Sequence, residues 1–86
     1  MRTMKQVLAE FQRMQEQLIG DGIVEVNVYC NGKYWAIRVQ KVTFTDNNEV
    51  KTRDYVEWVH YTCHDEEQEQ KNEKLLAEFK EKFNLK

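Results

Sequence analysis

The 86-residue chain is predicted to be an α+β domain of order α-β-β-β-α, a three-stranded antiparallel meander with both helices on one sheet face. Three observations support this fold class. Apolar side chains have helical spacing in residues 4–19, they alternate with polar ones through residues 23–62, and helical spacing returns from residue 65. The length allows one hydrophobic core, so residues 1–86 are expected to form a single domain.

The first helix is predicted over residues 4–19. Polar residues oppose a single apolar stripe, so the segment has one face for a core. The stripe consists of Met4, Val7, Leu8, Phe11, Met14, Leu18 and Ile19. Gly20 follows directly, and it is expected to end the helix in the left-handed conformation that glycine adopts easily.

The first two strands are predicted over residues 23–30 and 33–45. Asn31-Gly32 lies between them and is the dipeptide most typical of a two-residue hairpin turn, because both turn residues need positive φ. Such a turn fixes the register of the two strands. It places Tyr29 opposite Tyr34, Val28 opposite Trp35, Val26 opposite Ile37 and Glu25 opposite Arg38.

The third strand is predicted over residues 50–62, after a turn at residues 46–49. A loop of two or of four residues gives the same register there, which pairs Arg38 with Glu57 and Tyr34 with Tyr61. Both hairpins place the same residues of the central strand on one face. The helices are expected to cover that face, which holds Val24, Val26, Val28, Trp35, Ile37, Val39, Val56 and Trp58.

The second helix is predicted over residues 65–84. Acidic residues gather at its start and lysines follow, the arrangement that the helix dipole favours. Thr62 is the expected N-cap. The first half of this helix is expected to project from the domain or to fray, because the apolar residues that anchor it lie in the second half. These are Leu75, Leu76, Phe79 and Phe83.

The sheet face without helices is the predicted interaction surface. In the predicted register, Tyr29, Tyr34 and Tyr61 form one row across all three strands. An exposed apolar patch of this extent usually marks an interaction site, and tyrosine buries area while it keeps a polar group. The predicted partner-binding residues are Tyr29, Tyr34, Tyr61, Tyr55, Val59 and Arg38.

These features predict a small protein-interaction domain without enzymatic activity. We expect a homodimer or higher oligomer that forms through the open sheet faces, or through the edges of the first and third strands. We also expect this chain to bind a protein partner and to act as a regulator, adaptor or inhibitor of bacterial or phage origin. The alternative is that this face binds no partner. Tyrosine and valine would then occur there only because they have a high propensity for strands, and the face would be solvated.

Single-stranded nucleic acid is the alternative ligand for the same face, because exposed aromatic side chains stack on unpaired bases. The predicted register places Arg38 between Glu25 and Glu57, which neutralise it. The order of elements is similar to that of the double-stranded RNA-binding domain, a family whose second helix begins with a basic cluster that contacts RNA. In this sequence the corresponding residues are acidic and disfavour nucleic acid: Asp65, Glu66, Glu67 and Glu69.

Catalytic residues, metal sites and cofactors are not expected. The sequence contains no serine, no phosphate-binding loop and no metalloprotease motif. Cys30, His60, Cys63 and His64 suggest zinc, but Cys30 and the third strand are separated by about 9.5 Å, two inter-strand spacings. The same separation disfavours a disulfide between the two cysteines, so both are expected to be reduced thiols.

Charge and hydropathy limit the class of protein further. Thirteen Lys and Arg residues against fifteen Asp and Glu residues give a net charge of −2, too balanced for bulk attraction to nucleic acid. The first residues lack the apolar segment of a secretory signal, and no stretch is long and apolar enough to span a bilayer. A cytoplasmic location without membrane contact is therefore expected.

Overall fold

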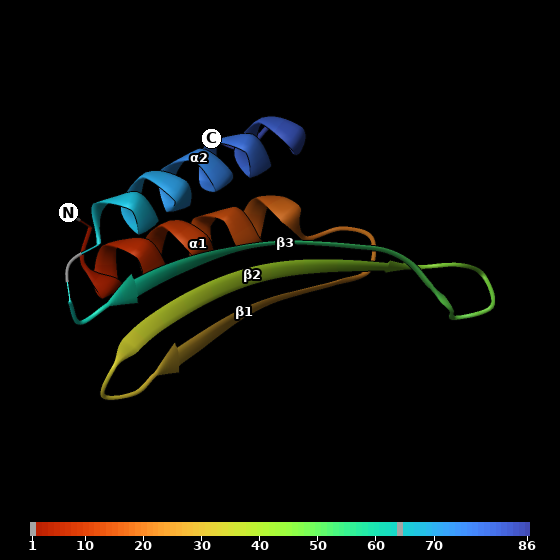
Figure 1. Cartoon of the computed structure of the whole chain (residues 1–86). Helices are drawn as coiled ribbons and strands as arrows, with labels where there is room; N and C mark the ends of the chain where they lie inside the picture. The colour runs from red at the N-terminus through yellow and green to blue at the C-terminus, as the bar shows by residue number, and fades with distance from the viewer. Residues whose placement is uncertain (1, 64) are drawn as a thin grey trace.

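The computed structural model describes residues 2–63 and 65–86. The elements are α1 (Met4–Leu18), β1 (Ile23–Cys30), β2 (Tyr34–Phe44), β3 (Val50–Tyr61) and α2 (Glu66–Lys82). The strands form one antiparallel sheet in the order β1-β2-β3, and both helices lie on one face of it (Figure 1). The predicted fold class is confirmed. In the described part of the chain, no helix combines the length and the hydropathy needed to cross a membrane.

Helix α1 begins with a capping box, in which the Thr3 hydroxyl accepts the N–H of Gln6 and the Gln6 side chain accepts the N–H of Thr3. The predicted stripe supplies its buried face, formed by Val7, Phe11, Met14 and Leu18. The expected left-handed cap at Gly20 is wrong, because the positive φ of this connection, +83°, is at Gly22.

The core lies between the helices and the sheet. Its buried strand residues are Ile37, Val39, Val56 and Trp58, and α2 adds Leu76 and Phe79. Four residues predicted on the core side lie outside it. Met4 and Ile19, at the two ends of the predicted stripe of α1, are 37% and 68% exposed. Val28 is 50% exposed, because β1 is an edge strand whose hairpin end curves away from the helices (Figure 1). Leu75 is 40% exposed, because it lies on the side of α2 that faces outward past β3.

The first hairpin has a different register from the predicted one, which is wrong by two residues. Tyr29 lies opposite Ala36 instead of Tyr34. The cause is Asn31, whose side-chain oxygen accepts the backbone N–H groups of Lys33 at 2.7 Å and Tyr34 at 3.1 Å. This bonding moves the turn one residue along the chain. A shift of two residues in the pairing keeps every side chain on its predicted face.

The second hairpin has the predicted register, with Tyr34 opposite Tyr61 and Arg38 opposite Glu57. The pairing changes only near the turn. A bulge between Thr43 and Phe44 ends the regular register there. The long central strand therefore carries the same faces through most of the sheet, and β2 joins the two hairpins in one surface.

The first half of α2 lies against the sheet, so the prediction that it projects or frays is wrong. Asp65 and not Thr62 is the N-cap, and its carboxylate accepts the N–H of Gln68 at 3.1 Å. Asn72 is only 1% exposed. Its amide nitrogen donates to the carbonyl of Val59 at 2.7 Å, and its oxygen accepts the Val59 N–H at 3.3 Å. The Asn72 side chain thus pairs with the edge of β3 as a neighbouring strand would.

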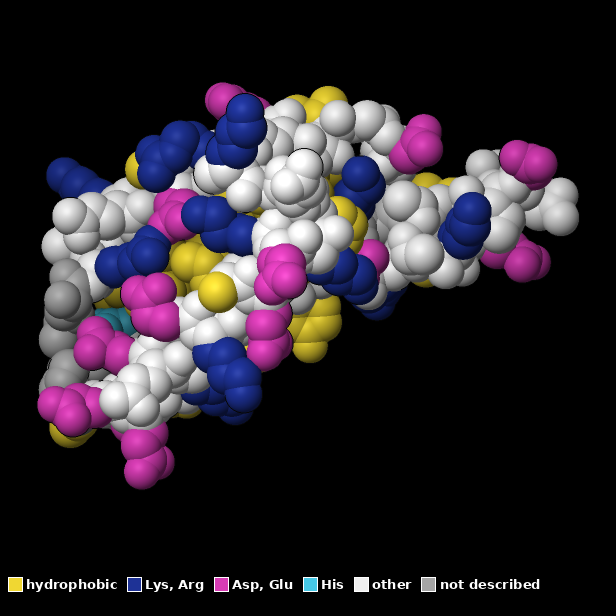
Figure 2. All heavy atoms as spheres, turned by 90° about the horizontal axis from the view of Figure 1, so that it is seen from above, with side chains coloured by type: hydrophobic (Ala, Val, Ile, Leu, Met, Phe, Trp, Pro, Cys, Tyr) yellow, Lys and Arg dark blue, Asp and Glu magenta, His cyan; other side chains and the backbone are white. Residues whose placement is uncertain are grey.

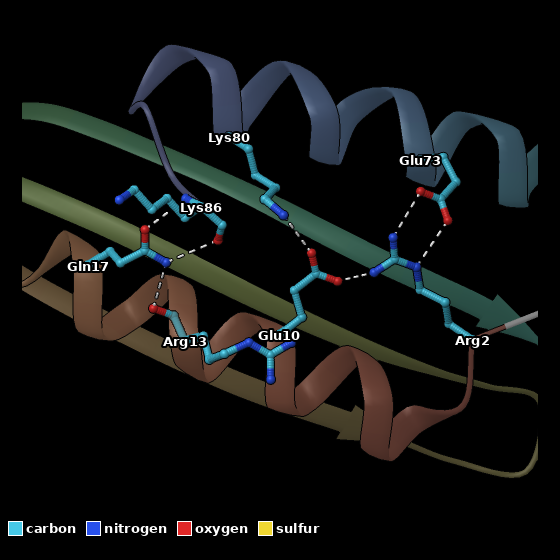
Figure 3. Close-up of polar contacts among 7 residues, drawn as sticks. All are labelled: Arg2, Glu10, Arg13, Gln17, Glu73, Lys80 and Lys86. Carbon is cyan, nitrogen blue, oxygen red and sulfur yellow. Dashed lines mark hydrogen bonds and ion pairs between the residues drawn. The ribbon is translucent and has the colours of Figure 1, made fainter.

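Polar side chains join the two helices above the sheet (Figure 3). Glu10 of α1 accepts a hydrogen bond from Lys80 of α2 at 2.8 Å and forms an ion pair with Arg2. Arg2 also pairs with Glu73 of α2 at 3.1 Å, and its guanidinium lies 5.2 Å from the ring centroid of Trp58. These contacts hold the helices together over one face, and the opposite face of the sheet stays uncovered.

Candidate functional site

The candidate site is the face of the sheet that carries no helix, referred to below as the open face. Alternate residues of a strand share a face, so the observed register defines its members. Its centre holds Asn27, Tyr29, Tyr34, Ala36, Arg38, Tyr55, Glu57, Val59 and Tyr61. All six predicted partner-binding residues are therefore on one surface.

Three tyrosines form a continuous aromatic row across the sheet, the tyrosine ladder. The rings of Tyr29 and Tyr34 are stacked, with centroids 5.5 Å apart. The rings of Tyr34 and Tyr61 are tilted, with centroids 5.9 Å apart. Tyr29 is 57% exposed and Tyr61 is 43% exposed, while Tyr34 between them is half-buried. The ladder forms although Tyr29 lies diagonal to Tyr34, because long side chains reach a diagonal neighbour.

A hollow of about 300 Å³ lies beside the ladder. Ala36 forms its floor and is only 6% exposed, although no helix covers this face. The small side chain leaves room between much larger neighbours, which supply an aromatic wall and a polar rim. The residues that line the hollow are Asn27, Tyr29, Tyr34, Ala36, Arg38 and Glu57.

A second hollow, of about 170 Å³, lies further along the same face. Val42 is 8% exposed there and lies between Phe44 and Ile23, which are 40% and 51% exposed. These residues are not among the partner-binding residues predicted from the sequence. The open face therefore has two hollows with apolar centres, one on each side of the middle of β2.

The charge between the hollows is neutralised. Arg38 pairs with Glu57 at 3.4 Å, and its guanidinium lies 4.6 Å from the centroid of the Tyr55 ring. The predicted row of Glu25, Arg38 and Glu57 is wrong in one member, because the shifted register places Glu25 opposite Gln40. Arg38 therefore has one carboxylate and one aromatic ring as neighbours.

The environment of the ladder affects the acidity of its central member. Desolvation, followed by the adjacent Tyr29, raises the pKa of Tyr34 above the usual value of 10.0. The phenol is therefore neutral at physiological pH. It retains both a donor and an acceptor for hydrogen bonds.

The cysteines and histidines do not form a common site among residues 2–63 and 65–86, where no three His, Cys, Asp or Glu side chains are placed to hold a metal ion. Cys30 and Cys63 are exposed and free. The ring of His60 is stacked against Trp35, with centroids 5.2 Å apart. His64 lies outside the described residues.

The helical side has a different surface. Figure 2 shows Lys and Arg side chains interspersed with Asp and Glu side chains there, with apolar side chains in small groups between them. Mixed charge of this kind is typical of a solvated face. The open face, with its tyrosine ladder and two hollows, is the stronger candidate for binding.

Comparison with known proteins gives no relative from which a function can be carried over. The chain matches no family model, no curated protein and no solved structure.

Proposed function

We propose that the chain is a protein-binding domain and that the open face is its binding surface. The observation that supports this most is the hollow over Ala36, which has an apolar floor and two tyrosines as walls and opens on a face without helices. The partner in this proposal is a protein that inserts an apolar side chain into the hollow. Its neighbouring polar groups bind the hydroxyls of the tyrosine ladder.

The physical chemistry of interfaces supports the proposal. Tyrosine and arginine are enriched among the residues that supply most binding energy, and such residues surround pockets that lose their water on binding. Tyr29 and Tyr34 are stacked before any partner arrives, so little side-chain entropy remains to be lost. The Arg38–Glu57 pair adds hydrogen-bonding groups without net charge.

The same observations favour a protein over single-stranded nucleic acid. A base needs a free aromatic face, but the faces of Tyr29 and Tyr34 that meet in the stack are occupied by each other. A phosphate needs a free cation, but Arg38 is engaged by Glu57 and by the Tyr55 ring. Nucleic acid is therefore an outcome to be tested and not the proposal.

The experiment fills the hollow with a larger side chain and compares the proteins that are bound with and without this substitution. Photo-crosslinking from benzoylphenylalanine in place of Tyr61 is carried out in a lysate of the cells that produce the protein, with no further substitution, with Ala36→Leu and with Leu75→Glu. Leu75 is an exposed apolar residue on α2 and serves as the matched control. We expect one crosslinked protein that disappears with Ala36→Leu and persists with Leu75→Glu. Equal crosslinking in all three, or crosslinking only to added oligothymidine, would contradict the proposal.

A further inference from the structure

The two edges of the sheet differ in how well they are protected against pairing with a further strand. On β3, the Asn72 side chain occupies both backbone groups of Val59, and a bulge interrupts the strand near its turn. Both are ways in which proteins prevent a further strand from adding to an edge. On the other side, β1 is an uninterrupted strand of eight residues whose only charged side chain is Glu25.

The backbone of β1 has a free stretch. The carbonyl of Val24 accepts a hydrogen bond from Gln15 at 3.2 Å, so it points away from β2. Backbone groups alternate in direction along an antiparallel strand, so those of Val26, Val28 and Cys30 also point away from β2. Gln15 covers the edge at Val24. The free stretch therefore runs from Val26 to Cys30.

We propose that a second copy of this chain pairs with the free stretch, antiparallel, with the two-fold axis at Val28. Val28 then lies opposite Val28 of the second copy, and Val26 lies opposite Cys30. This register uses only the free backbone groups and leaves the bond between Gln15 and Val24 intact. It also pairs Val28, an apolar side chain that is 50% exposed in one copy, with another apolar side chain.

Registers displaced toward the start of β1 fit less well. An axis at Glu25 places two carboxylates directly opposite each other, which is destabilising. An axis at Val26 requires the Val24 carbonyl to accept a strand bond beside the bond from Gln15. With the axis at Val28, Tyr29 lies opposite Asn27 of the second copy, and the tyrosine ladders of the two copies approach each other on one continuous sheet.

This inference goes beyond the proposed function, because it uses the edge of the sheet and leaves the Ala36 hollow free in both copies. The first test is the solution mass by light scattering over a concentration series. We expect twice 10.4 kDa for the natural sequence and for Tyr34→Glu. A monomer at all concentrations would overturn the inference. Loss of the dimer in Tyr34→Glu would replace the edge with the open face as the site of self-association.

The register between the two copies is tested by placing a charged residue at position 28, where the proposed two-fold axis passes. In Val28→Lys and in Val28→Glu, like charges oppose each other in a homodimer, so each variant is expected at half the mass of the natural dimer. An equal mixture of the two is expected to recover the dimer mass, because opposite charges then meet. Val28→Thr is the matched control and is expected to remain a dimer. A mixture that stays monomeric would contradict the axis at Val28.

If the charged variants fail to fold, Val28→Pro gives an independent test. Proline lacks the N–H that the second copy needs, and an edge position whose N–H faces solvent tolerates it. Circular dichroism checks the fold, and the expected result is a folded monomer. A folded dimer of Val28→Pro would overturn pairing through this edge.

Discussion

Gly22 is the residue at which the connection between α1 and β1 depends on the absence of a side chain. Its φ is +83°, and an added Cβ would overlap the carbonyl oxygen of Val42. We expect Gly22→Ala to reduce the free energy of unfolding by roughly 1–3 kcal/mol, the cost of a strained backbone. Gly20→Ala is the matched control and is expected to change it by less than about 0.5 kcal/mol, because nothing lies within 4 Å of the added carbon. Urea unfolding measures both, and equal losses would contradict this account of the connection.

Tyr34 provides a test of the ladder at the same scale. Its pKa is raised above 10.0 in the folded protein, so the folded state holds this proton more tightly than the unfolded state does. The associated stability is present below pH 10 and is lost as the pH rises from there through the folded pKa. We expect the ultraviolet titration step that is lost in Tyr34→Phe to be centred above pH 10. A lost step centred below pH 10 would show that Tyr34 is not in the environment described.

At the scale of elements, Asn72 shows how α2 is fixed to the edge of β3. We expect Asn72→Ala to lower the free energy of unfolding by roughly 1–3 kcal/mol, because the partly buried N–H and C=O of Val59 lose their partner. Gln70→Ala removes an exposed amide from the same helix and is expected to have an effect within about 0.5 kcal/mol. Thermal and urea unfolding measure the difference. Similar effects of the two substitutions would show that the edge contact does not hold the helix.

The elements also show which parts of the fold follow from sequence. Helical spacing and strand alternation depend on burial, which dominates the energetics, so the order of elements, the second hairpin and the identity of the open face were predictable. The first register was not, because the Asn31 side chain bonds to the turn in place of the expected backbone conformation. Asn72 was missed because an apolar pattern ignores a buried polar residue, and the Ala36 hollow depends on neighbours from other strands.

At the scale of the whole molecule, the sheet has one face in the core and one open face. Large side chains on the two faces should therefore differ in how much they contribute to the free energy of unfolding. We expect Trp58→Ala to lower the free energy of unfolding by roughly 3–5 kcal/mol, as large-to-small core changes do. Tyr61→Ala is expected to cost clearly less, because Trp58 is 3% exposed and Tyr61 is 43% exposed. Equal losses in urea unfolding would show that the open face is covered.

The central claim is that the open face is free for a partner even when two copies are joined at the edge of β1. Hydroxyl-radical footprinting read by mass spectrometry tests it most directly, with the natural sequence compared with Val28→Lys, the variant that we expect to be a monomer. We predict equal oxidation rates for Tyr61 and Tyr55 in the two proteins, since both residues lie on the open face away from β1. Protection of these tyrosines in the natural protein alone would contradict the claim, because it would mean that self-association buries the face assigned to the partner.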